Sequence, residues 1–182
     1  LATASKDGTI RLWDVSDPHK PKTKHVLSVP GAEVLVVRFS PDGKALIGGD
    51  SRGTTTTWDA STGAITMKQG AHKRLVSDLA FTHKGDRIAT ASHDGTVAWW
   101  RLDRSAPAPA QGHAGPIYGM AIDPTGRMVA SGGTDAHVRL WEQSTGKQLG
   151  VLEGHQQNIN SLRFGPKGDR LVSGSNDRSV RI

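Results

Sequence analysis

The sequence contains no cysteine and only one tyrosine, and aromatic residues make up 5% of its 182 residues. Without cysteine the chain can have no disulfide, thiolate zinc site, iron–sulfur cluster or cysteine nucleophile. No apolar run approaches the roughly 18 residues that a membrane-spanning helix needs, and no basic, apolar leader follows Leu1. We therefore expect a cytoplasmic protein without a membrane partner.

The charge balance is basic. The chain has 23 Lys and Arg residues against 17 Asp and Glu residues, which gives a net charge of +6. This balance permits attraction to nucleic acid or to an acidic partner but does not establish either. Apolar residues recur at regular intervals between 22 Gly and 9 Pro residues, as in a globular chain rich in turns.

Four residue types recur in fixed phase. Trp13, Trp58, Trp100 and Trp141 are separated by 45, 42 and 41 residues. A His lies 28 residues before the Trp position at His72, His113 and His155. An Asp lies six residues before it at Asp7, Asp94, Asp135 and Asp177, and a hydroxyl residue lies ten before it at Thr3, Thr90, Ser131 and Ser173. These markers indicate an internal repeat of about 42 residues.

The local signals within each repeat are those of strands and turns. Apolar residues mark a first strand within 34–39, 76–81, 117–122 and 159–164. A turn that ends in Gly follows each, as in Ser40-Pro41-Asp42-Gly43, because Pro presets the bend and Gly supplies a positive φ. A small-residue strand, an Asp-centred turn, an alternating strand and a further strand complete the repeat. Four antiparallel strands per repeat predict one propeller blade.

The pairs Gly112-His113 and Gly154-His155 and the dipeptides Trp13-Asp14 and Trp58-Asp59 make the whole chain resemble the WD-repeat family of β-propellers. The resemblance implies an all-β, incomplete propeller of four-stranded antiparallel blades, with three full blades and two partial ones. The expected segments are a partial blade at 1–29, a divergent blade at 30–71, blades at 72–112 and 113–154, and a partial blade at 155–182. We expect an internal fragment of a longer protein.

The recurring His, hydroxyl and Asp residues could suggest a hydrolase triad, but a triad occurs once and this set recurs. The resemblance implies instead a buried hydrogen-bond chain from indole to hydroxyl to imidazole to carboxylate. The expected sets are His72, Thr90, Asp94 and Trp100; His113, Ser131, Asp135 and Trp141; and His155, Ser173 and Asp177. We expect no catalytic residue, no cofactor and no metal site, since His83 and His137 have no second ligand at metal spacing.

The blade before Trp58 departs from the pattern. Pro30, Gly48 and Arg52 stand at its His, hydroxyl and Asp positions, and its third strand reads Thr54-Thr55-Thr56-Thr57. Threonine keeps β-propensity but reduces apolar burial, so this blade is expected to be the least stable. The departure fits drift in a blade held by its neighbours, or a blade diverged to bind something through Arg52.

The loop before the first strand and the turn between the second and third strands share one face of a meander. The resemblance implies that partners bind there. The single tyrosine, Tyr118, lies in this set and is a residue type enriched at binding hot spots, whereas Trp99 is expected to pack in the core. The candidate contact residues are Leu75, Ser77, His93, Pro116, Tyr118, Thr134, Asn158, Asn160 and Asn176, with Lys6, Glu33, Leu35 and Ser51 at equivalent positions.

The function favoured by the sequence is a non-enzymatic scaffold that binds a protein or peptide within a multi-protein complex. A second hypothesis is binding of nucleic acid or an acidic partner through a basic insertion on the opposite face, although the insertion lacks aromatics for base stacking. Its basic residues are His19, Lys20, Lys22, Lys24 and His25. A third is a regulatory domain of a larger multidomain enzyme, whose catalytic domain would lie elsewhere.

Overall fold

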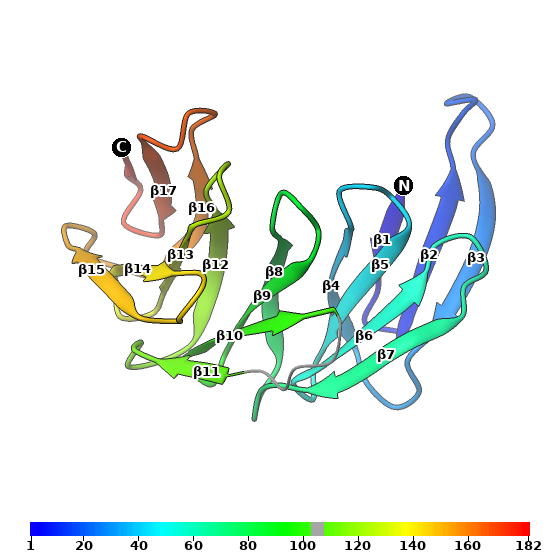
Figure 1. Cartoon of the computed structure of the whole chain (residues 1–182), viewed down its shortest axis with the longest axis horizontal. Helices are drawn as coiled ribbons and strands as arrows, with labels where there is room; N and C mark the ends of the chain where they lie inside the picture. Colours follow the sequence, from blue (N-terminus) through cyan, green and yellow to red (C-terminus); the bar gives the residue numbers. More distant parts are fainter. Residues whose placement is uncertain (103–107) are drawn as a thin grey trace.

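The computed structural model describes residues 1–102 and 108–182, and within these it consists of β-strands, turns and loops. The strands form five antiparallel sheets in this part of the chain: three four-stranded meanders between two three-stranded sheets. Figure 1 shows the sheets fanned into an open arc, with the two termini at its opposite ends. The predicted all-β, incomplete propeller is confirmed; residues 103–107 of the expected blade 72–112 lie outside the described residues.

The sheets follow one another along the chain, and each is a simple meander. Sheet A contains β1 (Ala2–Ala4), β2 (Thr9–Asp14) and β3 (Lys22–Ser28). Sheet B contains β4 (Val34–Phe39), β5 (Ala45–Asp50), β6 (Thr54–Asp59) and β7 (Ile65–Gly70). Sheet C contains β8 (Val76–Phe81), β9 (Arg87–Ser92), β10 (Thr96–Arg101) and β11 (Ala108–Gln111). Sheet D contains β12 (Ile117–Ile122), β13 (Met128–Gly133), β14 (Val138–Glu142) and β15 (Gln148–Leu152), and sheet E contains β16 (Ile159–Phe164), β17 (Leu171–Ser175) and β18 (Val180–Arg181).

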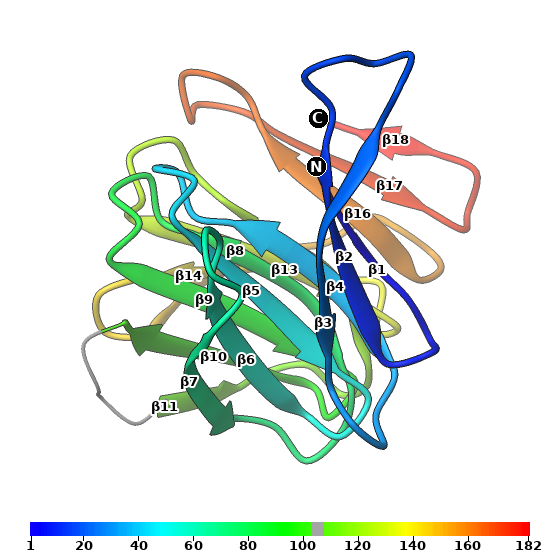
Figure 2. The ribbon, with the colours of Figure 1, turned by 90° about the vertical axis from the view of Figure 1, so that its right-hand side faces the viewer.

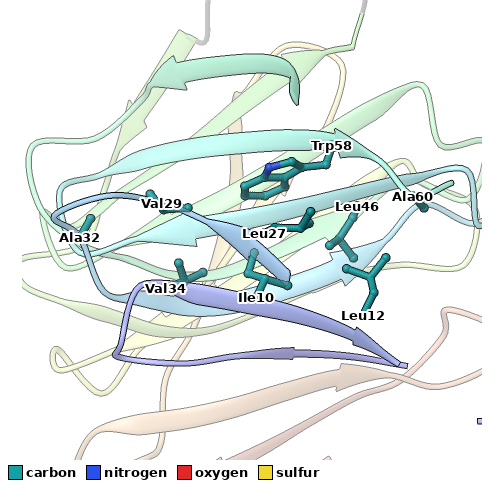
Figure 3. Packing of buried hydrophobic residues seen from close by; sticks show 9 residues of the cluster. All are labelled: Ile10, Leu12, Leu27, Val29, Ala32, Val34, Leu46, Trp58 and Ala60. Carbon is teal, nitrogen blue, oxygen red and sulfur yellow. The ribbon is translucent and has the colours of Figure 1, made fainter. Parts of the chain in front are cut away.

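The hydrophobic core lies between neighbouring sheets. Between sheets A and B, Ile10 and Leu12 of β2 pack with Leu46 of β5 and Trp58 of β6, as Figure 3 shows. Each such aliphatic side chain contributes roughly 1.5–3 kcal/mol when fully buried. Comparable clusters join sheet B to C, C to D and D to E, so each sheet is stabilised by the sheets beside it.

Trp99 and Trp100 point into different junctions. Trp99 packs between sheets C and D, with its ring centroid 5.9 Å from that of Trp141. Its predicted role in the core is confirmed by its exposure of 9%. Trp100 packs between sheets B and C instead, with Val36 and Ile47. Because successive strand residues point to opposite faces, the pair contributes to both junctions of its sheet.

The small residues of the second strands permit this close packing. A Cβ added at Gly49 would lie 2.6 Å from a methyl carbon of Val76 on the next sheet. One added at Gly132 would lie 2.7 Å from a methyl carbon of Ile159. Glycine at these positions therefore lets a β-branched residue of the following sheet approach the backbone.

The turns have the conformations expected of them. Gly43, Gly85, Gly126 and Gly168, which end the first turn of each repeat, have φ between 71° and 74°. In the Asp-centred turn, Gly8, Gly53 and Gly95 all have φ of 82°, but Ala136 (φ 61°) and Arg178 (φ 67°) occupy the same position in the later repeats. A residue with a side chain is disfavoured in this left-handed region by about 1–2 kcal/mol.

The hairpin that joins β2 to β3 projects beyond its neighbours, as the side view of Figure 2 shows in blue. It carries two of the predicted basic residues, His19 and Lys20, which are exposed. Lys22, Lys24 and His25 belong to β3 rather than to the hairpin loop. The imidazole Nε2 of His25 lies 2.9 Å from the carbonyl oxygen of Ser61. The five basic residues therefore do not form one loop cluster.

We predict that Ala136→Gly stabilises the protein. Glycine adopts the positive φ without strain, and this relief exceeds the added entropy of the unfolded chain, so the free energy of unfolding should rise by about 0.5–1 kcal/mol. Urea denaturation measures the change. As a control, Gly95→Ala should destabilise, since its Cβ would lie 2.8 Å from the carbonyl oxygen of His113. A fall in stability for Ala136→Gly would contradict the prediction.

Candidate interaction face

The loop before each first strand is bonded to the turn that follows the second strand. In sheet C the backbone N–H of His93 donates to the carbonyl of Leu75 at 3.1 Å. The same bond joins Ser51 to Glu33, Thr134 to Pro116 and Asn176 to Asn158, each at 2.9 Å. The structure thus brings the predicted contact residues together in pairs, one pair at the same end of each of four sheets.

A β-bulge stands beside each pair. The register of β12 against β13 shifts between Ile117 and Gly119, so that Tyr118 is the extra residue. The equivalent shifts leave Leu35, Ser77 and Asn160 as the extra residues of β4, β8 and β16. A bulge re-aims its extra side chain away from the regular alternation. Four of the predicted contact residues therefore owe their direction to bulges, which the sequence analysis did not anticipate.

The most developed contact on this face crosses the junction of sheets C and D. The rings of His93 and Tyr118 meet edge to face, with centroids 5.1 Å apart and an interplanar angle of 80°. Below them the Ser77 hydroxyl donates to the carbonyl of Ile117 at 2.6 Å. Both rings are half-buried, so their exposed parts are held in fixed positions. Leu75 and Pro116 are also half-buried. The backbone carbonyl of each accepts the loop–turn hydrogen bond of its own sheet.

Sheet E presents amides instead of aromatic rings. The Asn160 side-chain amide donates to the Asn176 side-chain oxygen at 2.5 Å, and both residues are exposed. Asn158 and Thr134 are half-buried, and each belongs to one of the loop–turn pairs described above. Lys6 and Glu33 are exposed on sheets A and B, away from the aromatic pair in sequence and sheet order.

The predicted hydrogen-bond chain is complete in sheet D. The Trp141 indole N–H donates to the Ser131 hydroxyl at 2.8 Å. The Ser131 oxygen lies 2.8 Å from Nε2 of His113, and Nδ1 of His113 lies 2.9 Å from Oδ1 of Asp135. Ser131 is fully buried, so each member of the chain needs the next as its hydrogen-bond partner. The chain ties the leading loop of the sheet to its Asp-centred turn.

The other two predicted sets differ from this one. In sheet E, His155 lies 2.9 Å from the Ser173 hydroxyl and 2.8 Å from Asp177. In sheet C, His72 contacts the hydroxyls of Thr90 and Thr96, each at 2.8 Å, and lies 3.5 Å from Asp94.

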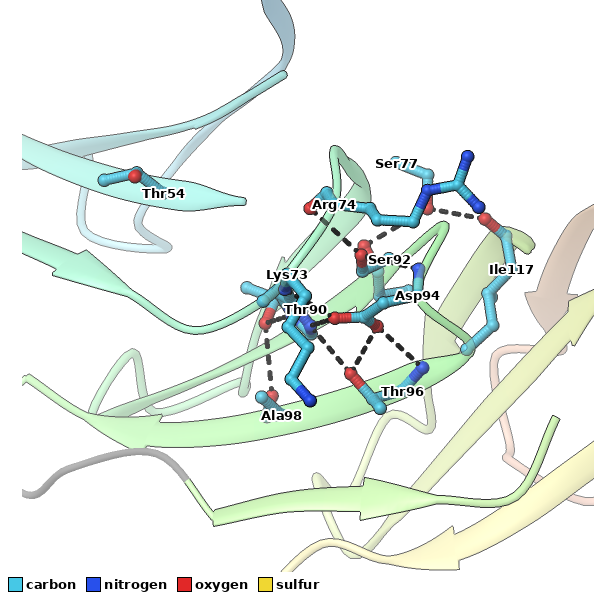
Figure 4. A network of polar contacts seen from close by, with 12 residues as sticks. Thr54, Lys73, Arg74, Ser77, Thr90, Ser92, Asp94, Thr96, Ala98 and Ile117 are labelled. Atoms are coloured by element: carbon cyan, nitrogen blue, oxygen red, sulfur yellow. Dashed lines mark hydrogen bonds and ion pairs between the residues drawn. The ribbon is translucent and has the colours of Figure 1, made fainter. Parts of the chain in front are cut away.

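The prediction that the Trp100 indole donates to the Thr90 hydroxyl is wrong. Its buried indole nitrogen has no hydrogen-bond partner within the described residues. The Thr96 hydroxyl lies between the imidazole of His72 and the carboxylate of Asp94, and it donates a hydrogen bond to Asp94 at 2.6 Å (Figure 4).

In the divergent sheet B, a buried aspartate takes the place of this hydrogen-bond chain. Asp50 is 4% exposed, and one of its oxygens accepts backbone N–H bonds from Arg52 and Thr54, each at 2.9 Å. The Arg52 guanidinium donates to the carbonyl of Gly31, so it holds its own loop as well as facing solvent. Thr57 is buried with its hydroxyl unpaired. The sequence analysis missed Asp50, although a carboxylate two residues before Arg52 was the available signal.

Burial makes these sites unsuitable for catalysis by a serine or threonine. Ser131 and Thr90 are 0% exposed, and Ser173 is 6% exposed. A nucleophile must reach the substrate, and these hydroxyls are enclosed by bonds to their own repeat. Within the described ranges, no three His, Cys, Asp or Glu side chains gather as a metal site would require. His83 is exposed in a turn, and His137 is half-buried beside β14.

The titration of the buried groups follows from desolvation. Burial lowers the pKa of His72 and of His113, although Asp94 and Asp135 act in the opposite direction. Burial alone would raise the pKa of Asp135, but the bond from His113 and backbone N–H groups outweigh it, and the net shift is downward. The pKa of Asp94 is also lowered, with hydrogen bonds from Thr96 outweighing its burial.

A half-buried carboxylate joins the innermost strands of three sheets. Asp78 of β8 pairs with Arg38 of β4 at 3.3 Å and accepts the backbone N–H of Met120 of β12 at 3.1 Å. Burial raises its pKa, against the charge of Arg38. Asp78 lines a hollow of about 220 Å³ together with Arg163 of β16. The sequence analysis did not single out this residue, because its partners come from repeats about 40 residues away on either side.

The chain belongs to the WD-repeat family. The family model described as WD domain, G-beta repeat, matches residues 1–14, 63–101, 109–142 and 146–182. The matched ranges omit residues 15–62, which contain most of the divergent sheet B. In the described part of the chain no helix is long and apolar enough to cross a membrane.

Curated relatives match between 79% and 100% of this chain, which covers about half of their own length or less. Periodic tryptophan protein 2 of Arabidopsis thaliana is 28% identical over 98% of this chain and 20% of its own length. Transcription initiation factor TFIID subunit 5 of Caenorhabditis elegans is 32% identical over 79% of this chain and 22% of its own length. The guanine nucleotide-binding protein subunit beta of Solanum tuberosum is 23% identical over the whole chain. The chain spans about half of that protein's length.

We predict that Ser131→Ala lowers the free energy of unfolding by roughly 2–3 kcal/mol, because the buried indole of Trp141 and imidazole of His113 both lose their partner. Urea denaturation measures the loss. Ser173→Ala is the matched control: among the described residues its hydroxyl is hydrogen-bonded to His155 and to no indole, so the loss of stability should be smaller. Equal losses for the two variants would contradict a cooperative role for the chain in sheet D.

We predict that stability falls as the pH drops below about 6.5, the usual pKa of histidine. His72 and His113 have lowered pKa values when folded, so the unfolded chain binds protons first and is favoured by acid. Asp94 and Asp135, whose pKa values are also lowered, add a second fall below about pH 4.

Urea denaturation across the pH range measures both steps. The double variant His72→Gln, His113→Gln should show a flatter profile between about pH 7 and pH 5, the range in which unfolded histidine titrates. A wild-type profile that is already flat in this interval would contradict the prediction.

Proposed function

We propose that the chain is a non-enzymatic interaction scaffold that binds a protein or peptide at the face formed by its loop–turn pairs. The observation that carries the proposal is the His93–Tyr118 contact across the junction of sheets C and D. A half-buried aromatic pair on a rigid support presents apolar surface without a large cost in side-chain ordering. The bulge at Tyr118 and the part-buried hydrogen bond from Ser77 to the carbonyl of Ile117 fix the position of the pair.

The same proposal places the chain within a multi-protein complex. Two of its relatives are named as subunits, of a transcription initiation factor and of a guanine nucleotide-binding protein. The buried hydroxyls favour binding over catalysis for the described chain. The cytoplasmic location stays a prediction from the sequence. The same holds for a role as the regulatory domain of a longer protein whose catalytic domain lies elsewhere.

Nucleic-acid binding through the projecting hairpin is the competing function. His19 and Lys20 are exposed at its tip, and Lys22 and Lys24 are exposed on β3. The five residues are divided between the hairpin loop and β3, and no aromatic side chains are interleaved with them for base stacking. The peptide-binding proposal is therefore preferred, and the experiment below separates the two.

We predict that Tyr118→Ala removes a protein partner captured from native lysate by the full-length protein, and that capture of this partner survives nuclease treatment. Ile65→Ala is the control, because Ile65 is a large apolar side chain that is exposed (58%) but lies on the edge strand β7, away from the loop–turn pairs. Thermal melts establish that both variants are folded. A partner retained by Tyr118→Ala, or lost to nuclease whatever residue 118 is, would contradict the proposal.

A further inference from the structure

We infer that the segment bound at this face is an acidic peptide: a carboxylate side chain pairs with Arg74, and an adjoining apolar side chain packs on Tyr118. The inference rests on the proposed function and adds the chemistry of the partner. It is supported by the positive charge of Arg74 beside the aromatic pair, which no described residue neutralises.

Arg74 is the last but one residue before β8, in the loop that is bonded to the turn carrying His93. Its backbone is fixed, since its carbonyl accepts the Ser92 hydroxyl at 3.1 Å. Its side chain is exposed and, among the described residues, makes no hydrogen bond or ion pair. Figure 4 shows the side chain extending from its loop toward Ser77 and Ile117. Ser77 lies in β8, at the junction of sheets C and D across which Tyr118 contacts His93.

The charge of Arg74 acts on the aromatic pair. The pKa of His93 is lowered by burial and, second, by the positive charge of Arg74. His93 is therefore kept neutral, and its ring packs on Tyr118 without a charge of its own. The guanidinium is left as the cation beside this surface.

The nearest carboxylate of the same loop–turn pair cannot neutralise Arg74. Oδ1 of Asp94 accepts both the N–H and the hydroxyl of Thr96, at 2.9 and 2.6 Å. Its Oδ2 accepts the backbone N–H of Lys73 at 2.8 Å. The carboxylate is thus held inward by three bonds, as Figure 4 shows. Rotation toward Arg74 would break this network.

The corresponding carboxylate of sheet D is held in the same manner. Asp135 is bonded to His113 and ion-paired with Arg139 at 3.3 Å. The acids next to the aromatic pair therefore face inward, and Arg74 and the exposed Lys73 face outward. A carboxylate from a partner can supply the missing counter-charge, and a guanidinium can bind it through two parallel hydrogen bonds.

A peptide fits these observations better than a nucleic acid. Base stacking requires free aromatic faces along a basic groove. Here the two rings are half-buried and contact each other, and the Asn160 and Asn176 side chains continue the face with an amide pair. The guanidinium of Arg74, with Lys73 exposed next to it, beside one apolar surface matches an acidic residue beside an apolar residue.

A random linear peptide library displayed on phage tests the inference on the purified chain. Wild type should enrich peptides that contain Asp or Glu next to an apolar residue. Arg74→Glu should weaken a selected peptide by about tenfold or more and enrich Lys or Arg in place of the acid. Lys22→Glu, an exposed basic residue of β3, is the matched charge control and should select as wild type does. Binding of the synthetic peptides is measured by fluorescence anisotropy.

The outcomes separate the two proposals. Peptides that depend on Tyr118 but are neutral or basic would overturn the acidic partner and leave the binding face intact. If no selected peptide binds more weakly to Tyr118→Ala, the proposed face itself fails. Acidic peptides lost in Lys22→Glu and kept in Arg74→Glu would assign binding to β3 and overturn the inference. Displacement of a selected peptide by single-stranded oligothymidylate would overturn it in favour of nucleic acid.

Discussion

The packing of each sheet against its neighbour is the constraint on which the rest of this structure depends. An isolated four-stranded sheet exposes two faces, and the four-stranded sheets B, C and D here carry buried apolar residues on both. Val76 packs against the backbone at Gly49, and Ile159 packs against the backbone at Gly132, so the spacing between sheets is set by contacts that leave no room for a Cβ. The arc in Figure 1 repeats this contact from one sheet to the next.

The polar end of each sheet follows from this packing. Once the sheets exclude water from Ser131 and Trp141, their donors and acceptors must be paired internally. The three His sets solve this requirement differently: sheet D uses an indole, whereas sheet C inserts Thr96 and leaves Trp100 unpaired. Both indoles pack against the preceding sheet, Trp100 against sheet B and Trp141 against sheet C, so the direction of packing does not account for the difference. Sequence position alone therefore does not determine which bonds a repeat makes.

The sequence predicts the features that period and local propensity determine, and it misses both the recurring bulges and the contacts made by single repeats. The strands, the glycine turns and the burial of Trp99 all follow from period and local propensity. The bulge that re-aims Tyr118, the buried Asp50 and the three-sheet contacts of Asp78 do not. The bulge depends on the register of two strands in one sheet, Asp50 on the N–H groups of its own turn, and Asp78 on strands of two other repeats. The period does not encode this geometry.

The same distinction explains where binding chemistry can arise on a repetitive fold. The backbone pairs at the top of each sheet, such as His93 with Leu75 and Asn176 with Asn158, are identical in kind. They cannot by themselves distinguish one partner from another. Specificity must come from side chains that the repeat leaves free to vary, and the bulge residues are free in this sense because the ladder does not use their side-chain direction. Aromatic rings at one junction and paired amides on the next sheet therefore give a uniform scaffold a local preference.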